Sequence, residues 1–235
     1  MSKYYPIMLD IRGRLAIVVG GDRIAAEKAT ALSASGAHVT ILSPNFCDEL
    51  LVQAEQKAVT LWQKAYEPGD LAGAFIVIAA TNNQKLIEAL CAETQERGQL
   101  LNIVDVPAFC SFIIPSILRR EQLTIAVSTE GASPGLAKRI RSNLEDLFPL
   151  VFGAYLRLAS VARTHLRQNG VSYAQRDNFF GEYYASTILK KLAEGHIEQA
   201  TAETADLLKT YNVTVSGSAL EAGLEEKKNY VKQSA

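Results

Sequence analysis

Cysteine and histidine are scarce in this chain of 235 residues, and neither is arranged as a metal site requires. The three cysteines, Cys47, Cys91 and Cys110, are widely separated and form no C-x-x-C pair. The three histidines are equally scattered. This pattern predicts no metal centre and no disulfide framework, and it fits buried thiols in a reducing compartment.

The chain also lacks an excess of charge of either sign. Lysine and arginine together number 24 against 25 acidic residues, for a formal net charge of −1. Since no global charge favours nucleic acid or an anionic membrane surface, we expect neither as a partner. No hydrophobic run is long enough to span a bilayer, and the first ten residues contain no signal-peptide core. We therefore expect a globular cytoplasmic protein, because the 48% of hydrophobic residues supply a sizeable core.

Residues 14–43 have the pattern of a nucleotide-binding βαβ unit. Leu15–Val19 is a short apolar run, which predicts a buried parallel strand. Two glycines at 20–21 end this run, and small or apolar residues then recur at helical spacing over 24–35. Residues 39–42 predict the second strand. A helix that begins just after a glycine turn directs unpaired N–H groups and the positive end of its dipole at one point, which suits a pyrophosphate.

The glycine turn departs from the G-x-G-x-x-G/A dinucleotide fingerprint. Gly20 and Ala25 fill its first and third positions, but Asp22 stands where the second glycine is expected. A carboxylate there repels a dinucleotide unless the side chain turns away. No acidic residue ends the second strand, since residues 43–45 are Ser-Pro-Asn. Two interpretations stay open: dinucleotide binding, or a structural Gly-Gly turn in a βαβ unit.

Two further apolar runs predict strands that end in polar side chains. Residues 74–80 stop at Thr81-Asn82-Asn83, and residues 100–104 stop at Asp105. Ligands bind at the carboxyl ends of parallel strands, so both endings are candidate contacts. A plain cap for the helix predicted over 84–97 is an equal alternative for the first ending. Asp105 is a candidate general base, and an Asp that merely caps a turn before proline is its alternative.

The alternation of strands and helices breaks after residue 111. Residues 112–118 and 123–128 predict two strands joined by a short connection, Arg119–Gln122, rather than by a helix. A helix then follows with Ser133 as N-cap and Pro134 at its first position. Basic side chains crowd its opening turns, which indicates an anionic partner or, alternatively, a solvated face. They are Lys138, Arg139 and Arg141.

The rest of the chain is predicted to be helical, with extended residues only at the start. Helical spacing recurs over 150–167, 178–193 and 197–211, and residues 217–235 have the composition of a polar helix or frayed tail. Residues 1–13 predict an extended lead-in whose apolar side chains pack under the sheet. The fold class is therefore α/β, with a Rossmann-like parallel sheet in the N-terminal domain and a helical C-terminal domain. The predicted boundaries are 1–111 for the nucleotide-binding domain, 112–147 for the strand region with its linking helix, and 148–235 for the helices.

Several short motifs are distributed over residues 4–150. They are Pro6-Ile7-Met8-Leu9; Val18-Val19-Gly20-Gly21 with Ala25 and Lys28; Gly36-Ala37 with Val39-Thr40; Ala79-Ala80-Thr81; Asn102-Ile103-Val104-Asp105-Val106-Pro107; Ser111-Phe112-Ile113-Ile114-Pro115-Ser116; and Ala126-Val127-Ser128-Thr129 with Gly131, Ser133 and Pro134. In this order the chain resembles the precorrin-2 dehydrogenase family, relatives of the N-terminal dehydrogenase and ferrochelatase part of siroheme synthase. Asn-x-x-Asp-x-Pro followed by Ser-Phe-Ile-x-Pro is specific in combination.

The resemblance implies a homodimeric enzyme that uses NAD to oxidise precorrin-2 to sirohydrochlorin, with ferrous iron insertion in some members. It makes Asp105 the catalytic residue and 112–147 a dimerisation region. The cofactor-binding residues that it implies are Gly20, Gly21, Asp22, Arg23, Ile24, Ser43, Pro44, Asn45, Thr81 and Asn82. The candidate substrate contacts are Asn102, Ser111, Thr129, Ser133, Lys138 and Arg141. The family usually has a third consecutive glycine where this chain has Asp22, a departure that bears on cofactor affinity rather than on fold.

Other functions stay open at this level. One is a non-catalytic sensor of NAD or of a tetrapyrrole, and another is a Rossmann dehydrogenase for an unrelated small acid. Iron insertion needs proton removal from pyrrole nitrogens and a transient metal contact, both within reach of one carboxylate, although no His or Cys cluster marks an iron site. The side chain of Asp105 discriminates between an enzyme and a sensor.

Overall fold

The computed structural model describes residues 4–233 of the chain, with side chains up to residue 225. Contacts divide these residues into two compact units, the first ending at Ile114 and the second beginning at Pro115. No described helix combines the length and the apolar character that a bilayer crossing needs. The three-part division predicted from the sequence is finer than these two units and stays a prediction.

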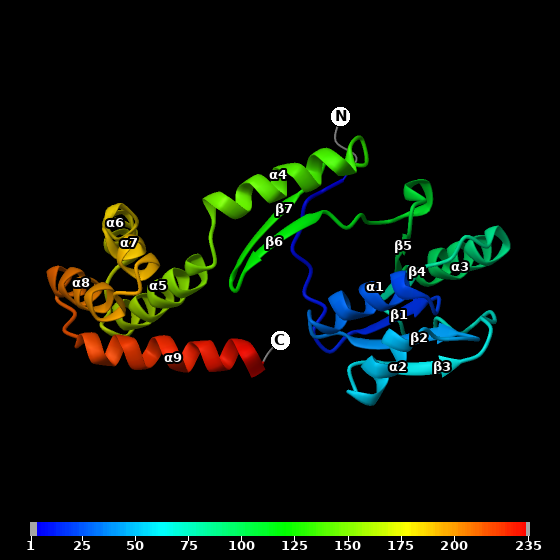
Figure 1. Ribbon diagram of the computed structural model, residues 1–235, viewed down its shortest axis with the longest axis horizontal. Coiled ribbons are helices and arrows are strands. Elements are labelled where there is room, and N and C mark those ends of the chain that lie inside the picture. Colours follow the sequence, from blue (N-terminus) through cyan, green and yellow to red (C-terminus); the bar gives the residue numbers. More distant parts are fainter. Residues whose placement is uncertain (1–3, 234–235) are drawn as a thin grey trace. The chain divides into compact units, whose positions relative to one another are not determined.

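The first unit is an alternation of strands and helices (Figure 1). Its elements are β1 (Leu15–Val19), α1 (Arg23–Ser33), β2 (His38–Ser43), α2 (Asp48–Glu55), β3 (Thr60–Gln63), β4 (Ile76–Ala79), α3 (Gln84–Arg97), β5 (Leu100–Ile103) and the 3₁₀ turn η1 (Pro107–Phe109). The five strands form one parallel sheet in the order β3-β2-β1-β4-β5. This confirms the predicted Rossmann-like α/β fold.

Both faces of this sheet are covered, as the wholly apolar central strands β1 and β4 require. Successive residues of a strand point to opposite faces. Val18 of β1 shares a buried cluster with Ala25 of α1 and Leu50 of α2. Val77 of β4 shares the other cluster with Leu90 of α3. Helices α1 and α2 therefore cover one face, and α3 covers the opposite face.

The strand order reverses between β1 and β4. From β1 the chain continues through β2 to β3 on one side, and β4 and β5 then lie on the other side. The connections leaving the carboxyl ends of β1 and β4 therefore diverge to opposite faces. Such a switch point leaves a crevice at the carboxyl edge of the sheet, where α/β proteins bind their ligands.

The second unit consists of a hairpin and helices. Its elements are β6 (Ser116–Arg120), β7 (Leu123–Val127), α4 (Pro134–Leu147), α5 (Val151–Gln168), α6 (Tyr173–Ala185), α7 (Ile188–Ala193), α8 (Ile197–Thr210) and α9 (Gly217–Gln233). Strands β6 and β7 pair antiparallel, and α4 packs along them (Figure 1). Rings of Tyr155 and Tyr183 stack with centroids 4.9 Å apart inside the helical core, and each hydroxyl donates to the other residue's carbonyl.

The tip of the hairpin is joined to the helices by an ion pair between an exposed carboxylate and a buried guanidinium. Glu121, with a positive φ of 55°, pairs with Arg157 of α5, whose side chain is only 6% exposed. The Glu121 carboxylate lies against Gly153, where a Cβ atom would approach it to 2.7 Å. Beside it, Arg120 Nε donates to the Phe148 carbonyl at 2.6 Å. The hairpin and α5 therefore belong to one packed unit.

Three predictions about local structure are wrong. Most of the apolar lead-in does not pack under the sheet: Tyr5 is 87% and Met8 is 72% exposed, whereas Ile11 joins the core beside β1 and α1. Arg119 and Arg120 are not loop residues but the end of β6, because the hairpin turns within two residues.

The third error concerns the helix predicted over 178–193. It is two helices, α6 and α7, that break at Ser186 and Thr187. The Ser186 hydroxyl donates to the Tyr183 carbonyl at 2.6 Å, and Thr187 bonds to Glu203. The Ser186 bond competes locally with the helical ladder, and the Thr187 bonds join the break to α8. The apolar periodicity of the sequence continues through residues 186–187, so it does not mark the break.

A buried carboxylate holds the loop between β3 and β4 onto α3. Glu93 is 7% exposed and accepts hydrogen bonds from Tyr66 Oη (2.6 Å), Arg97 Nε (2.9 Å) and the backbone N–H groups of Gly69 (2.9 Å) and Leu71 (3.2 Å). Burial alone raises the pKa of a carboxyl group, but these donors outweigh it and lower the pKa of Glu93.

Replacing Glu93 with glutamine removes the charge that these donors share. We expect Glu93→Gln to lower the free energy of unfolding at pH 7 by about 1–3 kcal/mol. Because the folded-state pKa lies below the unfolded one, the stabilisation is complete above about pH 4.3 and is lost as the pH falls through the folded-state pKa. The variant and the wild type therefore converge at low pH. Urea unfolding followed by the fluorescence of Trp62, the single tryptophan, measures this in the first unit.

Glu96→Gln is the matched control, since Glu96 is exposed on the same helix. Equal stability of the two variants at pH 7 contradicts the role given to Glu93.

Candidate functional site

The candidate site lies at the carboxyl edge of the five-stranded sheet. Four strands end there, each in a segment singled out from the sequence: β1 in the glycine turn 20–22, β2 in 43–45, β4 in 81–82, and β5 in the turn that carries Asp105. Neighbouring strands are about 4.8 Å apart, so Asp105 lies roughly 10 Å across the sheet from the end of β1. One edge therefore gathers a glycine turn, a helix start and a carboxylate.

The glycine turn has no room for side chains. A Cβ atom on Gly20 would approach the Ala80 carbonyl oxygen to 2.4 Å, and one on Gly21 would approach the Asn45 carbonyl oxygen to 1.7 Å. Gly20 also has a φ of 139°, which L-residues rarely adopt. The Gly21 carbonyl accepts from the N–H of Cys47 at 2.7 Å. The two glycines thus allow the end of β1 to lie directly against the segments that follow β2 and β4.

Asp22 turns its carboxylate toward its own helix. It is the N-cap of α1, and its Oδ1 atom accepts from the Ala25 N–H at 2.9 Å. One of the free N–H groups at the helix start is therefore already used. The N–H groups of Arg23 and Ile24 come before the first N–H of the helical ladder, that of Ala26, which donates to the Asp22 carbonyl. Both residues are exposed. This start of α1 still offers donors to an anion, next to a carboxylate.

The residues after β2 and β4 border the same turn. The hydroxyl of Ser43 lies 2.6 Å from the position of a Cβ on Gly21, and the Pro44 carbonyl accepts from Gln63 at 3.2 Å. The helix-cap interpretation holds for Asn83, whose Oδ1 accepts from the Leu86 N–H. Asn82 is exposed, and the Thr81 hydroxyl accepts from the Asn83 N–H at 3.2 Å.

Asp105 lies exposed in a tight turn directly after β5. The Val106 N–H donates to the Ile103 carbonyl at 3.3 Å, which closes the turn, and Asp105 has a positive φ of 61°. Asp and Asn tolerate this left-handed conformation better than most residues, but it is uncommon outside glycine. The carboxylate is therefore displayed at the sheet edge by a backbone that surrounding contacts must hold.

Two of the predicted substrate contacts instead hold this segment together. Asn102 is 9% exposed, and its amide donates to the Phe112 carbonyl at 3.0 Å. The Ser111 hydroxyl accepts from the Leu101 N–H at 2.7 Å, and the Ser111 N–H donates to the Leu101 carbonyl at 2.8 Å. Residues 110–112 thus run along the outer edge of β5, and a substrate role for Asn102 and Ser111 stays a prediction.

The other predicted substrate contacts belong to the second unit. Ser133 is the N-cap of α4 with Pro134 at the first position, as predicted, and Thr129 accepts from the Ser133 N–H at 3.0 Å. Lys138 is exposed, whereas Arg141 is paired with Glu145. Lys138 is therefore the freer cation, and binding by these four residues stays a prediction.

A resident metal has no donor set in the part of the chain whose residues are described. There, no three side chains of His, Cys, Asp or Glu come together as metal ligands. The cysteines carry free thiols. One of them, Cys110, contacts the turn of Asp105, and sequence reasoning treated it only as a buried thiol.

Family models match most of the chain up to α4. Residues 7–116 match the family described as putative NAD(P)-binding, and residues 120–147 match the central region of sirohaem biosynthesis proteins. The first match covers the whole sheet with its glycine turn, and the second covers the hairpin and α4.

Curated relatives are siroheme synthases. That of Photorhabdus laumondii is 36% identical over 197 residues, which are 84% of this chain and 42% of the relative. Those of Zymomonas mobilis (34% over 209 residues) and Baumannia cicadellinicola (32% over 218 residues) cover 89% and 93% of this chain. The chain spans less than half the length of these relatives.

A solved structure with the same arrangement is that of SirC, a precorrin-2 dehydrogenase. It superposes with a TM-score of 0.69 at 26% identity, over 82% of this chain and 98% of SirC. Over most of its length the chain is therefore similar to precorrin-2 dehydrogenase and to the part of siroheme synthase that these relatives share with it.

Proposed function

We propose that this protein is an NAD-dependent precorrin-2 dehydrogenase that produces sirohydrochlorin for siroheme biosynthesis. The observation that carries the proposal is the exposed carboxylate of Asp105 at the same strand edge as a glycine turn and a helix start. The names of the relatives, siroheme synthase and precorrin-2 dehydrogenase, supply the substrate class.

The residues at the end of β1 fit a dinucleotide. Gly20 and Gly21 keep side chains out of the turn, and the first N–H groups of α1 face outward. Asp22 does not block these groups, because its carboxylate is bonded to the Ala25 N–H. We therefore assign residues 20–24, 43–45 and 81–82 to NAD. When bound, NAD supplies the acceptor for the hydride that leaves the tetrapyrrole.

Asp105 takes up the remaining proton. Oxidation of precorrin-2 to sirohydrochlorin removes two electrons and two hydrogens, one as a hydride and one as a proton. A carboxylate accepts that proton when it lies within hydrogen-bond reach of the reacting carbon's C–H. The left-handed turn fixes the position of the Asp105 backbone at the sheet edge, from which the carboxylate projects.

The substrate is a polycarboxylate, and the second unit carries exposed basic residues. Arg119 and Lys138 are exposed, and the guanidinium of Arg119 has no acid partner among the described residues. Charge-assisted bonds to carboxylates are stronger than neutral ones. These cations are therefore the ones we assign to substrate side chains in the proposal.

The proposal includes a homodimer in the cytoplasm. Helix α4 carries an exposed apolar stripe of Leu136 (50%), Ile140 (38%) and Leu147 (67%). These residues lie within about 40° of one another around the helix, since each residue advances 100°. A contiguous apolar stripe of this kind marks an interface, and we assign it to a second copy of the chain. The free thiols are in keeping with a reducing compartment.

Asp105→Asn tests the proposed chemistry, since asparagine tolerates the left-handed backbone and has no charge to accept a proton. We expect kcat to fall by about 10²- to 10⁴-fold while the Kd for NAD stays unchanged. The assay follows anaerobic absorbance of purified protein with precorrin-2, with and without NAD, and then with ferrous iron. Glu55→Gln, an exposed carboxylate at the end of α2, is the control.

Each result of this assay has a distinct meaning. Retained turnover in Asp105→Asn removes Asp105 from the mechanism. A wild type that binds NAD but leaves precorrin-2 unoxidised contradicts the enzyme and favours a sensor. An enzyme-accelerated change on adding iron assigns metal insertion as well.

Two substitutions of Asp22 separate its charge from its capping bond. Asp22→Asn keeps a side-chain cap and removes the charge next to the diphosphate, so we expect NAD to bind about 2- to 5-fold tighter. Asp22→Gly also frees the Ala25 N–H and is expected to bind NAD at least as tightly as Asp22→Asn. Isothermal titration with NAD measures both. Weaker binding by both variants means that the charge does not oppose the cofactor.

Ile140→Glu tests the dimer. A charge in the middle of the apolar stripe is expected to convert dimers into monomers at micromolar concentration, as measured by sedimentation velocity. Ser142→Glu places the same charge on the opposite side of α4 and is expected to leave the dimer intact. A monomeric wild type contradicts the assignment of the stripe.

A further inference from the structure

The thiol of Cys110 lies inside the turn that carries Asp105. Its Sγ atom accepts from the Ile103 N–H at 3.1 Å. The same atom lies 3.3 Å from the Val106 carbonyl oxygen and 3.4 Å from the Ile103 carbonyl oxygen, so its S–H donates to one of them. One side chain therefore contacts the residues at both ends of the turn.

The sulfur is itself fixed from the strand. Asn102 Nδ2 lies 3.7 Å from Sγ and donates to the Phe112 carbonyl at 3.0 Å. The Cys110 N–H donates to the Pro107 carbonyl at 3.2 Å, across η1. Ser111 next to it is bonded to Leu101 on β5. Cys110 thus connects the turn to residues 110–112, which are themselves bonded to β5 through Ser111.

Asp105 needs such support because its own backbone does not favour the conformation. A φ of 61° lies in the left-handed region, which residues with a side chain seldom adopt, although Asp tolerates it better than most. The carboxylate is exposed, and among the hydrogen bonds of the described residues none is made by this side chain to hold the turn. The restraint on the turn therefore comes from the contacts of its neighbours Ile103 and Val106, and Cys110 contacts both.

We propose that Cys110 is the positioning residue that holds the carboxylate of Asp105 in its working direction. This rests on the proposed function, in which Asp105 accepts a proton. Removing the sulfur frees the turn to adopt other conformations, so that the carboxylate is aligned for only part of the time. Cofactor binding at the ends of β1 and β2 does not depend on this turn.

The protonation state of Cys110 suits this role. Burial raises the pKa of its thiol, more than the bond from the Ile103 N–H lowers it. The group therefore stays a neutral S–H at neutral pH and keeps a proton to donate to a carbonyl. A serine hydroxyl has the same donor and acceptor pattern with a shorter bond, whereas alanine has neither.

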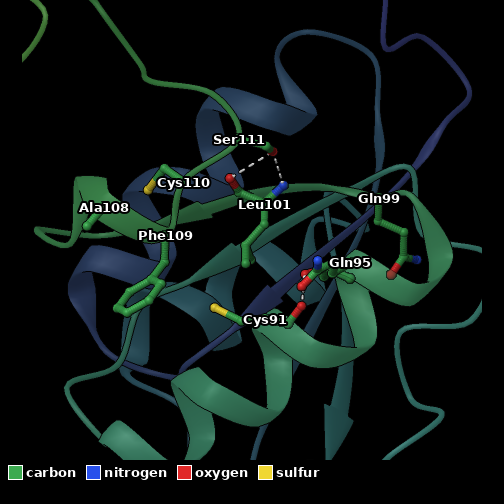
Figure 2. Close-up of a pocket in the computed structure, with 9 residues that line it drawn as sticks. Cys91, Gln95, Gln99, Leu101, Ala108, Phe109, Cys110 and Ser111 are labelled. Atoms are coloured by element: carbon green, nitrogen blue, oxygen red, sulfur yellow. Dashed lines mark hydrogen bonds between the residues drawn. The ribbon is translucent and has the colours of Figure 1, made fainter. Parts of the chain in front are cut away.

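Cys91 provides a control within the same pocket. Cys91 on α3 and Cys110 after η1 both border a pocket of about 340 Å³, together with Phe109 and Leu101 (Figure 2). Burial also raises the pKa of the Cys91 thiol. Among the hydrogen bonds of the described residues, none joins the Cys91 thiol to the turn. Loss of Cys91 therefore alters the pocket without altering the turn.

The experiment compares Cys110→Ala, Cys110→Ser and Cys91→Ala in the full-length protein. In Cys110→Ala we expect kcat for precorrin-2 oxidation to fall on the order of 10- to 100-fold, with the Kd for NAD within twofold of wild type. Amide hydrogen exchange at Ile103 and Val106, measured by NMR, is expected to accelerate. Cys110→Ser is expected to recover most of both properties, and Cys91→Ala to match the wild type.

Two results overturn the proposal. One is a Cys110→Ala variant with kcat and amide exchange within twofold of wild type. The other is an equal loss in Cys91→Ala, which means that the pocket rather than the turn is responsible. The exchange data are independent of activity: if wild type does not oxidise precorrin-2, the proposed function fails, and exchange at Ile103 and Val106 still decides whether Cys110 holds the turn.

Discussion

The close approach of Gly20 and Gly21 to their neighbours is the constraint on which the candidate site depends. With Cβ positions 2.4 Å from Ala80 and 1.7 Å from Asn45, any side chain at these glycines separates β1 from the segments after β4 and β2. Those segments carry the other proposed cofactor contacts. The start of α1 follows directly, so its N–H groups are aimed at the crevice by the same turn. One packing restriction therefore positions three strand ends and a helix dipole.

Asp105 is constrained in a different way. In the glycine turn, neighbouring atoms leave no space for a Cβ atom, so other residue types are excluded. In the turn at Asp105 a residue with a side chain adopts the left-handed conformation, with a φ of 61°. Its restraint comes from hydrogen bonds to the thiol of Cys110 and from the attachment of Ser111 to β5. Strain of this kind persists only where surrounding structure holds it, and it is common at working sites. Residues 110–112 thus cover the outer side of the edge strand β5 and also contact the turn that carries Asp105.

Most of the sheet could be predicted from the sequence because its signals are local. The run Leu15–Val19 and the helix Gln84–Arg97 with its left-handed Gly98 match the structure residue for residue. The direction of the Asp22 carboxylate was open, since the sequence does not say which way a side chain turns. The contacts of Cys110 were missed because their partners are mostly backbone atoms, which no residue pattern marks. The exposed lead-in was misjudged because its apolar residues resemble those of a packed strand.

The second unit extends the contrast between local and distant contacts. Ser133 and Pro134 predict the start of α4 because capping acts within one helical turn. The Glu121–Arg157 pair joins residues 36 positions apart, so the sequence near either residue does not predict the contact. It places a buried guanidinium under the hairpin tip, and loss of Glu121 leaves that buried charge without its partner. The hairpin, on which the proposed dimer depends through α4, is therefore tied to the helical core by electrostatics.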